Sequence, residues 1–139
     1  MYKGVIIEDS SILEAEKSLF KWRYMSDVVY LDRIIDDNFV EIGKSGKKLI
    51  KKDVIEELSN LGHDRLIDIY NFECIKLNDN VWLAHYITLS EEKKIYRTSI
   101  WKNVNGNLKI LFHQASEFKD DAELKKILSN RSPINKKKQ

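Results

Sequence analysis

The second half of the chain contains four runs rich in β-branched, aromatic and other apolar residues, each separated from the next by a turn signal. The runs cover residues 66–77, 80–89, 94–104 and 108–117, and the last two are joined by Asn105-Gly106. Asn-Gly between two such runs is a strong hairpin signal, because a type I′ turn needs two consecutive positive φ angles. Three successive hairpins predict a four-stranded antiparallel meander.

Helical periodicity dominates the first half. Ser11-Ile-Leu-Glu14 has the spacing of a capping box, and apolar residues follow it at helical intervals. Ser26 is placed to cap a second helix, and Asp53 a third helix that ends at Gly62. Between them residues 39–42 form a short strand-like run. This order predicts an α+β fold, with three N-terminal helices packed on one face of a curved antiparallel sheet.

The length and composition fit a single domain. The chain has 139 residues, of which 42% are hydrophobic and 33% charged, enough to bury a real core. We expect residues 1–118 to form one domain and residues 119–139 a C-terminal helical extension with a basic tail, the helix lying at 120–129. No apolar run has the length of a membrane span or of a signal-peptide core, so we expect a cytoplasmic protein without membrane contact.

The composition argues against several classes of partner and cofactor. A net charge of +2 gives no global field for nucleic acid, although lysines cluster at 47–52 and in the tail. The three histidines lack metal-ligand spacing, and no glycine-rich phosphate loop is present, so we expect neither a metal nor another cofactor. Cys74 is the single cysteine, which excludes an internal disulfide, and its apolar surroundings in the sequence predict an inert core thiol.

Three stretches carry a resemblance to a known group of proteins: 39-FVEIGKSG-46, 97-RTSIW-101 and 112-FHQ-114. In this order they resemble the nuclear transport factor 2-like superfamily, which includes SnoaL-like polyketide cyclases, and within it the domain of unknown function 4440 group. The resemblance spans about residues 11 to 117. Ala115-Ser116 stands where that group has Gly-Thr, and Met25 stands where an arginine is expected.

The resemblance implies a cone-shaped fold, in which helices close one side of a bent sheet and leave a pocket at the wide end. It also implies a homodimer formed through the outer face of the sheet. It does not imply a reaction, because this fold carries unrelated functions.

Glu41 is the first candidate for chemistry. Phe39 and Glu41 share one face of their strand, so Glu41 lies at the pocket wall if Phe39 packs inward. Burial raises the pKa of a carboxyl group, which would make Glu41 a general acid or base near neutral pH. The alternative is a structural ion pair with Arg97 or Arg23.

Glu16 is the second candidate, because it falls inside the apolar stripe of the first helix. A charge in that position needs a partner or a polar cavity. Either Glu16 lines the pocket, or it forms an ion pair with Arg23, which lies seven residues later on the same face.

Arg97, Ser99 and Trp101 alternate along one face of their strand. Such a row suits an anionic or planar ligand, because a guanidinium fork can hold the anion and the indole can form a wall. The same row would also suit exposed sheet surface or a dimer contact, where arginine and tryptophan are favoured.

His113 and Gln114 end the last strand and point to opposite faces. Gln114 alternates with Phe112, Ile110 and Leu108, the more apolar set, so we expect Gln114 to face the helices and His113 to face away. A β-bulge would reverse this phase. His113 therefore follows Glu41 as a catalytic candidate.

The sequence favours a small-molecule-binding protein with its pocket between helices and sheet. One alternative is an acid–base enzyme, of isomerase, dehydratase or hydrolase-like type, acting on a small carbonyl or hydroxy compound with Glu41 as base. Another is a regulatory module that binds a protein through the sheet. The residues expected to contact a ligand are Glu16, Trp22, Phe39, Glu41, Arg97, Ser99, Trp101 and Gln114.

Overall fold

The computed structural model describes residues 6–91 and 93–119, so the helix expected at 120–129 and the basic tail lie outside the described residues. In this part of the chain the helices are α1 (Asp9–Ser18), α2 (Trp22–Met25), α3 (Val28–Ile34) and α4 (Lys51–Ser59). The strands are β1 (Ile35–Ile42), β2 (Lys48–Ile50), β3 (Asp68–Asn78), β4 (Val81–Ser90), β5 (Lys93–Val104) and β6 (Asn107–Glu117).

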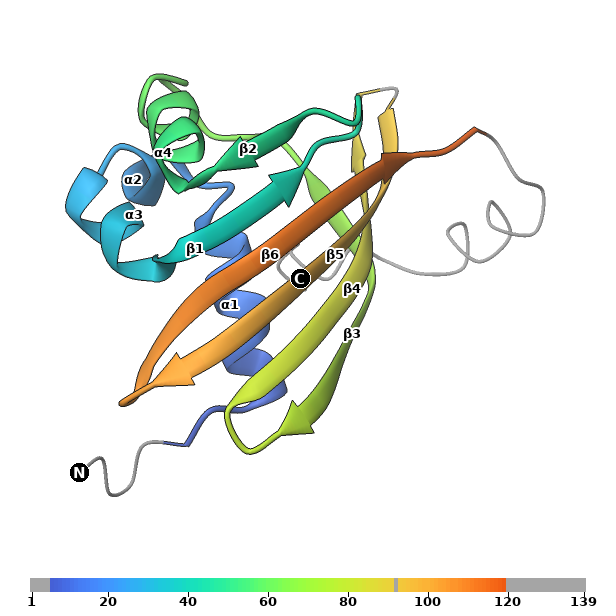
Figure 1. Ribbon diagram of the computed structural model, residues 1–139. Helices are drawn as coiled ribbons and strands as arrows, with labels where there is room; N and C mark the ends of the chain where they lie inside the picture. Colours follow the sequence, from blue (N-terminus) through green and yellow to red (C-terminus); the bar gives the residue numbers. More distant parts are fainter. Residues whose placement is uncertain (1–5, 92, 120–139) are drawn as a thin grey trace, which may run out of the picture.

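The strands form one curved sheet in the order β2-β1-β6-β5-β4-β3. Figure 1 shows α1 lying across one face of this sheet, while α2, α3 and α4 gather beside β1 and β2. The predicted α+β class is confirmed, but the prediction of a purely antiparallel sheet is wrong. β1 runs parallel to β6, because α4 and the whole meander connect them and no hairpin sets their direction.

The meander itself follows the prediction closely. β3 to β6 begin and end within two residues of the four expected runs, and Asn105 and Gly106 have φ angles of 54° and 86°. These two positive angles are what a type I′ turn requires. The first half differs from the prediction in three ways. The described residues form four helices instead of three, because α1 ends at Ser18 and Trp22–Met25 is the separate helix α2. In addition, β1 starts at Ile35, directly after α3, and the short edge strand β2 was not predicted.

Two helices begin three residues earlier than predicted. Ser11 is the third residue of α1, and its hydroxyl accepts a 3.2 Å hydrogen bond from the backbone N–H of Glu8. Asp53 does the same for the N–H of Ile50 at 3.0 Å, at the start of α4. The side chain of the third helical residue can accept a hydrogen bond from the free backbone N–H of the capping residue. A serine or aspartate near a helix start can therefore occupy either the capping position or the third position of the helix. Asp27 caps α3, one residue later than predicted.

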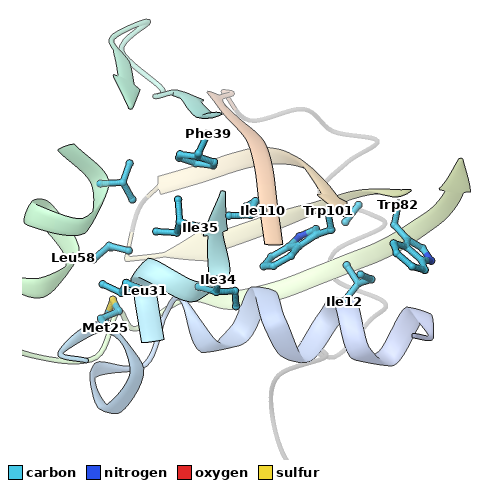
Figure 2. Packing of buried hydrophobic residues seen from close by; sticks show 12 residues of the cluster. Ile12, Met25, Leu31, Ile34, Ile35, Phe39, Leu58, Trp82, Trp101 and Ile110 are labelled. Atoms are coloured by element: carbon cyan, nitrogen blue, oxygen red, sulfur yellow. The ribbon is translucent and has the colours of Figure 1, made fainter. Parts of the chain in front are cut away.

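The core fills the space between α1 and the sheet and continues among the other helices (Figure 2). Ile12 of α1 and Trp101 of β5 are fully buried next to each other in this layer, and Leu31 is fully buried between α3 and its neighbours. Burying a side chain such as Leu31 contributes about 1.5–3 kcal/mol, so this continuous cluster is the main source of stability.

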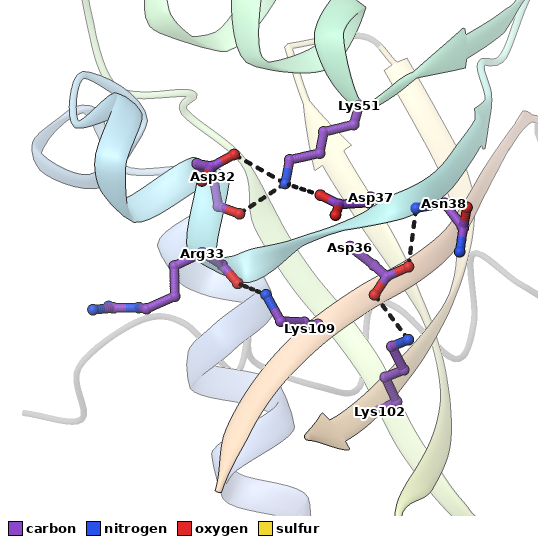
Figure 3. Close-up of polar contacts among 8 residues, drawn as sticks. All are labelled: Asp32, Arg33, Asp36, Asp37, Asn38, Lys51, Lys102 and Lys109. Atoms are coloured by element: carbon purple, nitrogen blue, oxygen red, sulfur yellow. Dashed lines mark hydrogen bonds and ion pairs between the residues drawn. The ribbon is translucent and has the colours of Figure 1, made fainter. Parts of the chain in front are cut away.

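Ion pairs fasten the corner where α3 turns into β1 (Figure 3). Lys51 of α4 contacts Asp32 at 3.0 Å and Asp37 at 2.9 Å, and Lys102 of β5 contacts Asp36 at 2.8 Å. The carboxylates of Asp32 and Asp37 are exposed, so each of those pairs adds little free energy. Their effect is geometric, since they hold β1 against α4 on one side and β5 on the other.

The outer face of the sheet, opposite α1, carries an apolar row that crosses every strand. Each member is paired in register with the next, and each is half-buried or exposed. In strand order from β3 to β2, the row consists of Ile75, Leu83, Ile100, Phe112, Val40 and Ile50.

A β-bulge interrupts β6. Ile100 pairs with Phe112, but the next residue, Trp101, pairs with Ile110, which leaves Leu111 as an extra residue on β6. An extra residue shifts the alternation of side chains by one beyond that point. The bulge therefore decides which face every later residue of β6 occupies.

Candidate functional site

A cavity of about 120 Å³ lies between the helices and the inner face of the sheet. Its apolar wall comes from α1, β1, α4 and β6 and the segments beside them: Leu19, Phe20, Ile35, Phe39, Val54, Leu58, Leu61 and Ile110. Its polar lining brings together side chains from six different parts of the chain: Glu16, Glu41, Glu57, Arg65, Arg97 and His113.

Glu16 is held at the inner end of this cavity by two neutral donors. Its carboxylate accepts a hydrogen bond from the Tyr86 hydroxyl and another from Trp101 Nε1 at 2.7 Å, and it is almost fully buried. The alternative of an ion pair with Arg23 is wrong, because Arg23 is exposed and its guanidinium lies over the ring of Tyr24. Glu16 is thus a fixed acceptor that joins α1 to β4 and β5.

The structure reverses the prediction for the end of β6. Because of the bulge at Leu111, His113 pairs with Ser99 and lines the cavity, whereas Gln114 pairs with Thr98 and is exposed. Gln114 is therefore no part of the cavity lining, and His113 is.

His113 belongs to a buried polar chain that fixes its tautomer. Arg97 donates from Nε to the Thr88 hydroxyl at 2.8 Å and points Nη1 at His113 Nε2 over 3.4 Å, while His113 Nδ1 lies 2.8 Å from the Ser99 hydroxyl. A guanidinium can only donate, so Nε2 is the acceptor and Nδ1 carries the proton. Burial, and then the charges of Arg97 and Arg65, lower the pKa of His113 to about 3. His113 is neutral, with its lone pair already turned to Arg97.

Arg65 is a cavity residue that sequence reasoning missed. It lies in the segment between α4 and β3, its Nη1 donates to the Leu19 carbonyl at 3.2 Å, and its guanidinium lies 4.8 Å from the centre of the Phe20 ring. Burial, and then the nearby charge of Arg97, lower the pKa of Arg65 to about 10, which leaves it charged at neutral pH. Residues 63–65 lie between the predicted helix that ends at Gly62 and the predicted strand that begins at residue 66, so only an isolated charge beside apolar residues could have drawn attention to Arg65.

Glu41 lines the cavity together with Phe39, as strand alternation predicts. Burial raises the pKa of Glu41, and the positive charges of Arg65 and Arg97 oppose that rise. Among the described residues no basic nitrogen comes within 4.0 Å of its carboxylate, so the ion pair with Arg97 or Arg23 is absent there. Glu41 is half-buried and available for proton transfer or hydrogen bonding.

The remaining predicted ligand contacts lie behind the cavity wall. Trp101 and Ser99 are fully buried, the one in the core and the other beneath His113. Trp22 is half-buried against the core, and its backbone N–H bonds to Asp64 at 2.7 Å. None of these three lines the cavity.

The Cys74 thiol is protonated at neutral pH. Burial raises the pKa of the half-buried Cys74 thiol to about 12, so it stays protonated. Across residues 6–91 and 93–119, no group of three or more His, Cys, Asp or Glu side chains is arranged to hold a metal ion. None of the helices in the same residues has the length and apolarity to cross a membrane.

Replacing Glu16 by alanine should remove the acceptor of two buried donors. Each unsatisfied donor costs about 1–3 kcal/mol, so we expect Glu16→Ala to lower the free energy of unfolding by about 3 kcal/mol, measured by urea denaturation. Glu14→Ala is the matched control, because Glu14 is exposed and, among the described residues, its side chain is bonded only to Lys17 at 3.3 Å. Equal effects of the two substitutions would contradict the role of Glu16.

His113 should stay neutral through mild acid. Its lowered pKa means that the neutral form stabilises the fold above pH 6.5, and that this contribution is lost as the pH falls from about 6.5 toward 3. We expect its ring signals, assigned by their absence in His113→Asn, to keep their NMR shifts from pH 8 to pH 5. A midpoint near pH 6 would show that the ring is not buried against the two arginines.

Comparison with known proteins identifies the fold. No family model and no curated protein matches the sequence. Three solved structures match well, and all three are nuclear transport factor 2-like proteins. One is from Cytophaga hutchinsonii, one is a protein of unknown function from Prochlorococcus marinus, and one is a protein of unknown function in nutrient uptake from Rhodospirillum rubrum.

Their sequences are 17%, 17% and 12% identical to this chain, with TM-scores of 0.68, 0.67 and 0.68. The matches cover 81%, 86% and 81% of this chain and 100%, 99% and 100% of the others. A protein of the domain of unknown function 3225 family from Pectobacterium atrosepticum is 18% identical, with a TM-score of 0.61, over 79% of this chain and 87% of its own. The described part of this chain therefore has the nuclear transport factor 2-like fold.

Proposed function

We propose that this protein binds a small organic molecule in the cavity between its helices and its sheet. One observation carries the proposal: the cavity combines an apolar wall with Arg65, Arg97 and Glu41, none of which has an ion-pair partner within 4.0 Å in the described residues. Burying a charged group without an ion-pair partner costs free energy. Ligand sites are usually apolar pockets that contain a few convergent polar groups.

The volume limits the size of the ligand. An apolar cavity of about 150 Å³ in another protein accepts benzene, so a cavity of about 120 Å³ suits a molecule of about six non-hydrogen atoms. Ligands this small gain at most about 1.5 kcal/mol per non-hydrogen atom, and ordinary ones gain far less. We therefore expect dissociation constants in the micromolar to millimolar range.

An acid–base enzyme is the second candidate, and Glu41 favours it. A carboxyl group with a raised pKa, facing a cavity and free of close cations, is suited to take a proton from a small carbonyl or hydroxy compound. His113 cannot be its partner, because that ring is neutral and its free nitrogen accepts from Arg97. Glu41 would act alone.

Blocking the cavity should abolish binding. Leu61 lines the cavity and is partly exposed, so the indole in Leu61→Trp can fill the space without a buried clash. The measurement is an NMR screen of compounds with about six non-hydrogen atoms, in which binding shifts the amide signals of Glu41 and His113. Compounds that shift these signals in the unmodified protein should not shift them in Leu61→Trp. Leu66→Trp, at an exposed position outside this cavity, should keep it. Equal binding by both variants would contradict the proposal.

The same screen in D2O tests the enzyme alternative. Enzymatic proton abstraction would exchange the α-protons of a small ketone or aldehyde for deuterium. Glu41→Gln, which removes the base, would stop the exchange even for those ligands that still bind. Exchange at the buffer rate with every ligand that binds would exclude this role for Glu41.

The assembly state is a separate proposal. We propose that two copies pair through the outer sheet face, because the apolar row from Ile75 to Ile50 crosses every strand and a charge-poor apolar stripe favours burial.

We also propose that the chain is related to the domain of unknown function 4440 group. The sequence motifs at 39–46, 97–101 and 112–114 support this relation.

A charge in the apolar row should split this dimer. Ile100 sits in the middle of the row, so Ile100→Lys would place an ammonium group in the interface. Light scattering after gel filtration should give twice the chain mass for the unmodified protein and a single chain mass for Ile100→Lys. Val29→Lys, which alters an exposed apolar residue on α3, should leave the dimer unchanged. A monomeric unmodified protein would contradict the assembly.

A further inference from the structure

We propose that the molecule bound in the cavity is a small monocarboxylate, held by the guanidinium groups of Arg65 and Arg97. This inference rests on the proposed binding function and narrows it to one chemical class. It depends on three features of the two arginines: their unused donors, the absence of a carboxylate within 4.0 Å of them among the described residues, and their shared position against one aromatic ring.

Most N–H donors of the two guanidinium groups have no acceptor. Each group offers five N–H donors. Arg97 uses Nε on Thr88 and one donor of Nη1 on His113, and Arg65 uses Nη1 on the Leu19 carbonyl. No further side-chain hydrogen bond of these arginines occurs within the described ranges. Since both side chains line the cavity, the unused donors are available to a ligand there.

The two positive charges lie close to the same aromatic ring, that of Phe20. The guanidinium carbons of Arg65 and Arg97 lie 4.8 Å and 5.7 Å from the centre of the Phe20 ring, and each charge disfavours the other. Glu41 and Glu57 reach them only at longer range, beyond the 4.0 Å of an ion pair in the described residues. An anion placed between the arginines would relieve their repulsion and form charge-assisted hydrogen bonds with both.

The other residues that line the cavity favour a carboxylate over other anions such as phosphate. Glu16, Glu41 and Glu57 also line the cavity, so a doubly charged phosphate would meet about twice the repulsion that a single negative charge meets. A planar carboxylate matches the guanidinium fork, and a short alkyl chain can lie on the apolar wall formed by residues such as Phe39 and Ile110. The volume leaves room for about three or four carbons beyond the carboxylate oxygens.

Butyrate and butyramide test the inference directly, since they have the same number of non-hydrogen atoms and differ in charge. Titrations followed by amide NMR shifts should give butyrate at least tenfold tighter binding, as expected for hydrogen bonds to a charged group. Arg65→Gln should reduce that preference below threefold. Arg23→Gln removes the same charge from an exposed site outside the cavity and should leave the preference unchanged.

The outcomes separate this inference from the function on which it rests. Equal affinity for butyrate and butyramide in the unmodified protein would overturn the carboxylate assignment, whatever the variants do, and would leave small-molecule binding standing. An unchanged preference in folded Arg65→Gln would also overturn it. If neither compound nor any member of the screen shifts the cavity signals, the proposed function fails as well.

Discussion

The carboxylate of Glu16 connects the two layers of this fold. It leaves α1 and accepts hydrogen bonds from Tyr86 on β4 and Trp101 on β5, residues 70 and 85 positions away along the chain. A buried carboxylate is stable only while its donors remain in place, so the helix cannot slide along the sheet without breaking both bonds. Two hydrogen bonds to one carboxylate therefore fix α1, and with it the part of the cavity lining that α1 contributes, against the inner face of the sheet.

The polar side chains of the cavity differ in how firmly hydrogen bonds hold them. Thr88, Ser99 and His113 hold Arg97 in one orientation, so a ligand would meet a donor that needs little ordering. Arg65 and Glu41 line the same cavity and have fewer side-chain hydrogen bonds than Arg97 among the described residues. The contrast matters for function, because preorganised groups favour binding, whereas a loosely held carboxyl group with a raised pKa is what proton transfer requires.

Local signals in the sequence predicted most of the fold. The strand runs and the Asn105-Gly106 turn depend on neighbouring residues, and the structure reproduces them. The site was harder to predict, because its geometry depends on distant pairing. The extra residue at Leu111 arises where β6 must match β5 and β1 together, and simple alternation therefore placed His113 on the wrong face. Arg65 lies in a segment without periodicity, so only the packing of α1 against that segment reveals its role.

The parallel pairing of β1 with β6 has a consequence for how the chain reaches its native state. β1 is made before β6, yet its larger neighbour in the sheet includes residues 110–114 of β6. Until β6 has left the ribosome, β1 therefore has only the short β2 to pair with and lacks its larger partner. Contacts between such distant segments raise the contact order and slow folding. The unpaired edge of β1, with Val40 on the apolar row, is exposed in the meantime, and this interval is when the nascent protein would be most prone to aggregation or to need a chaperone.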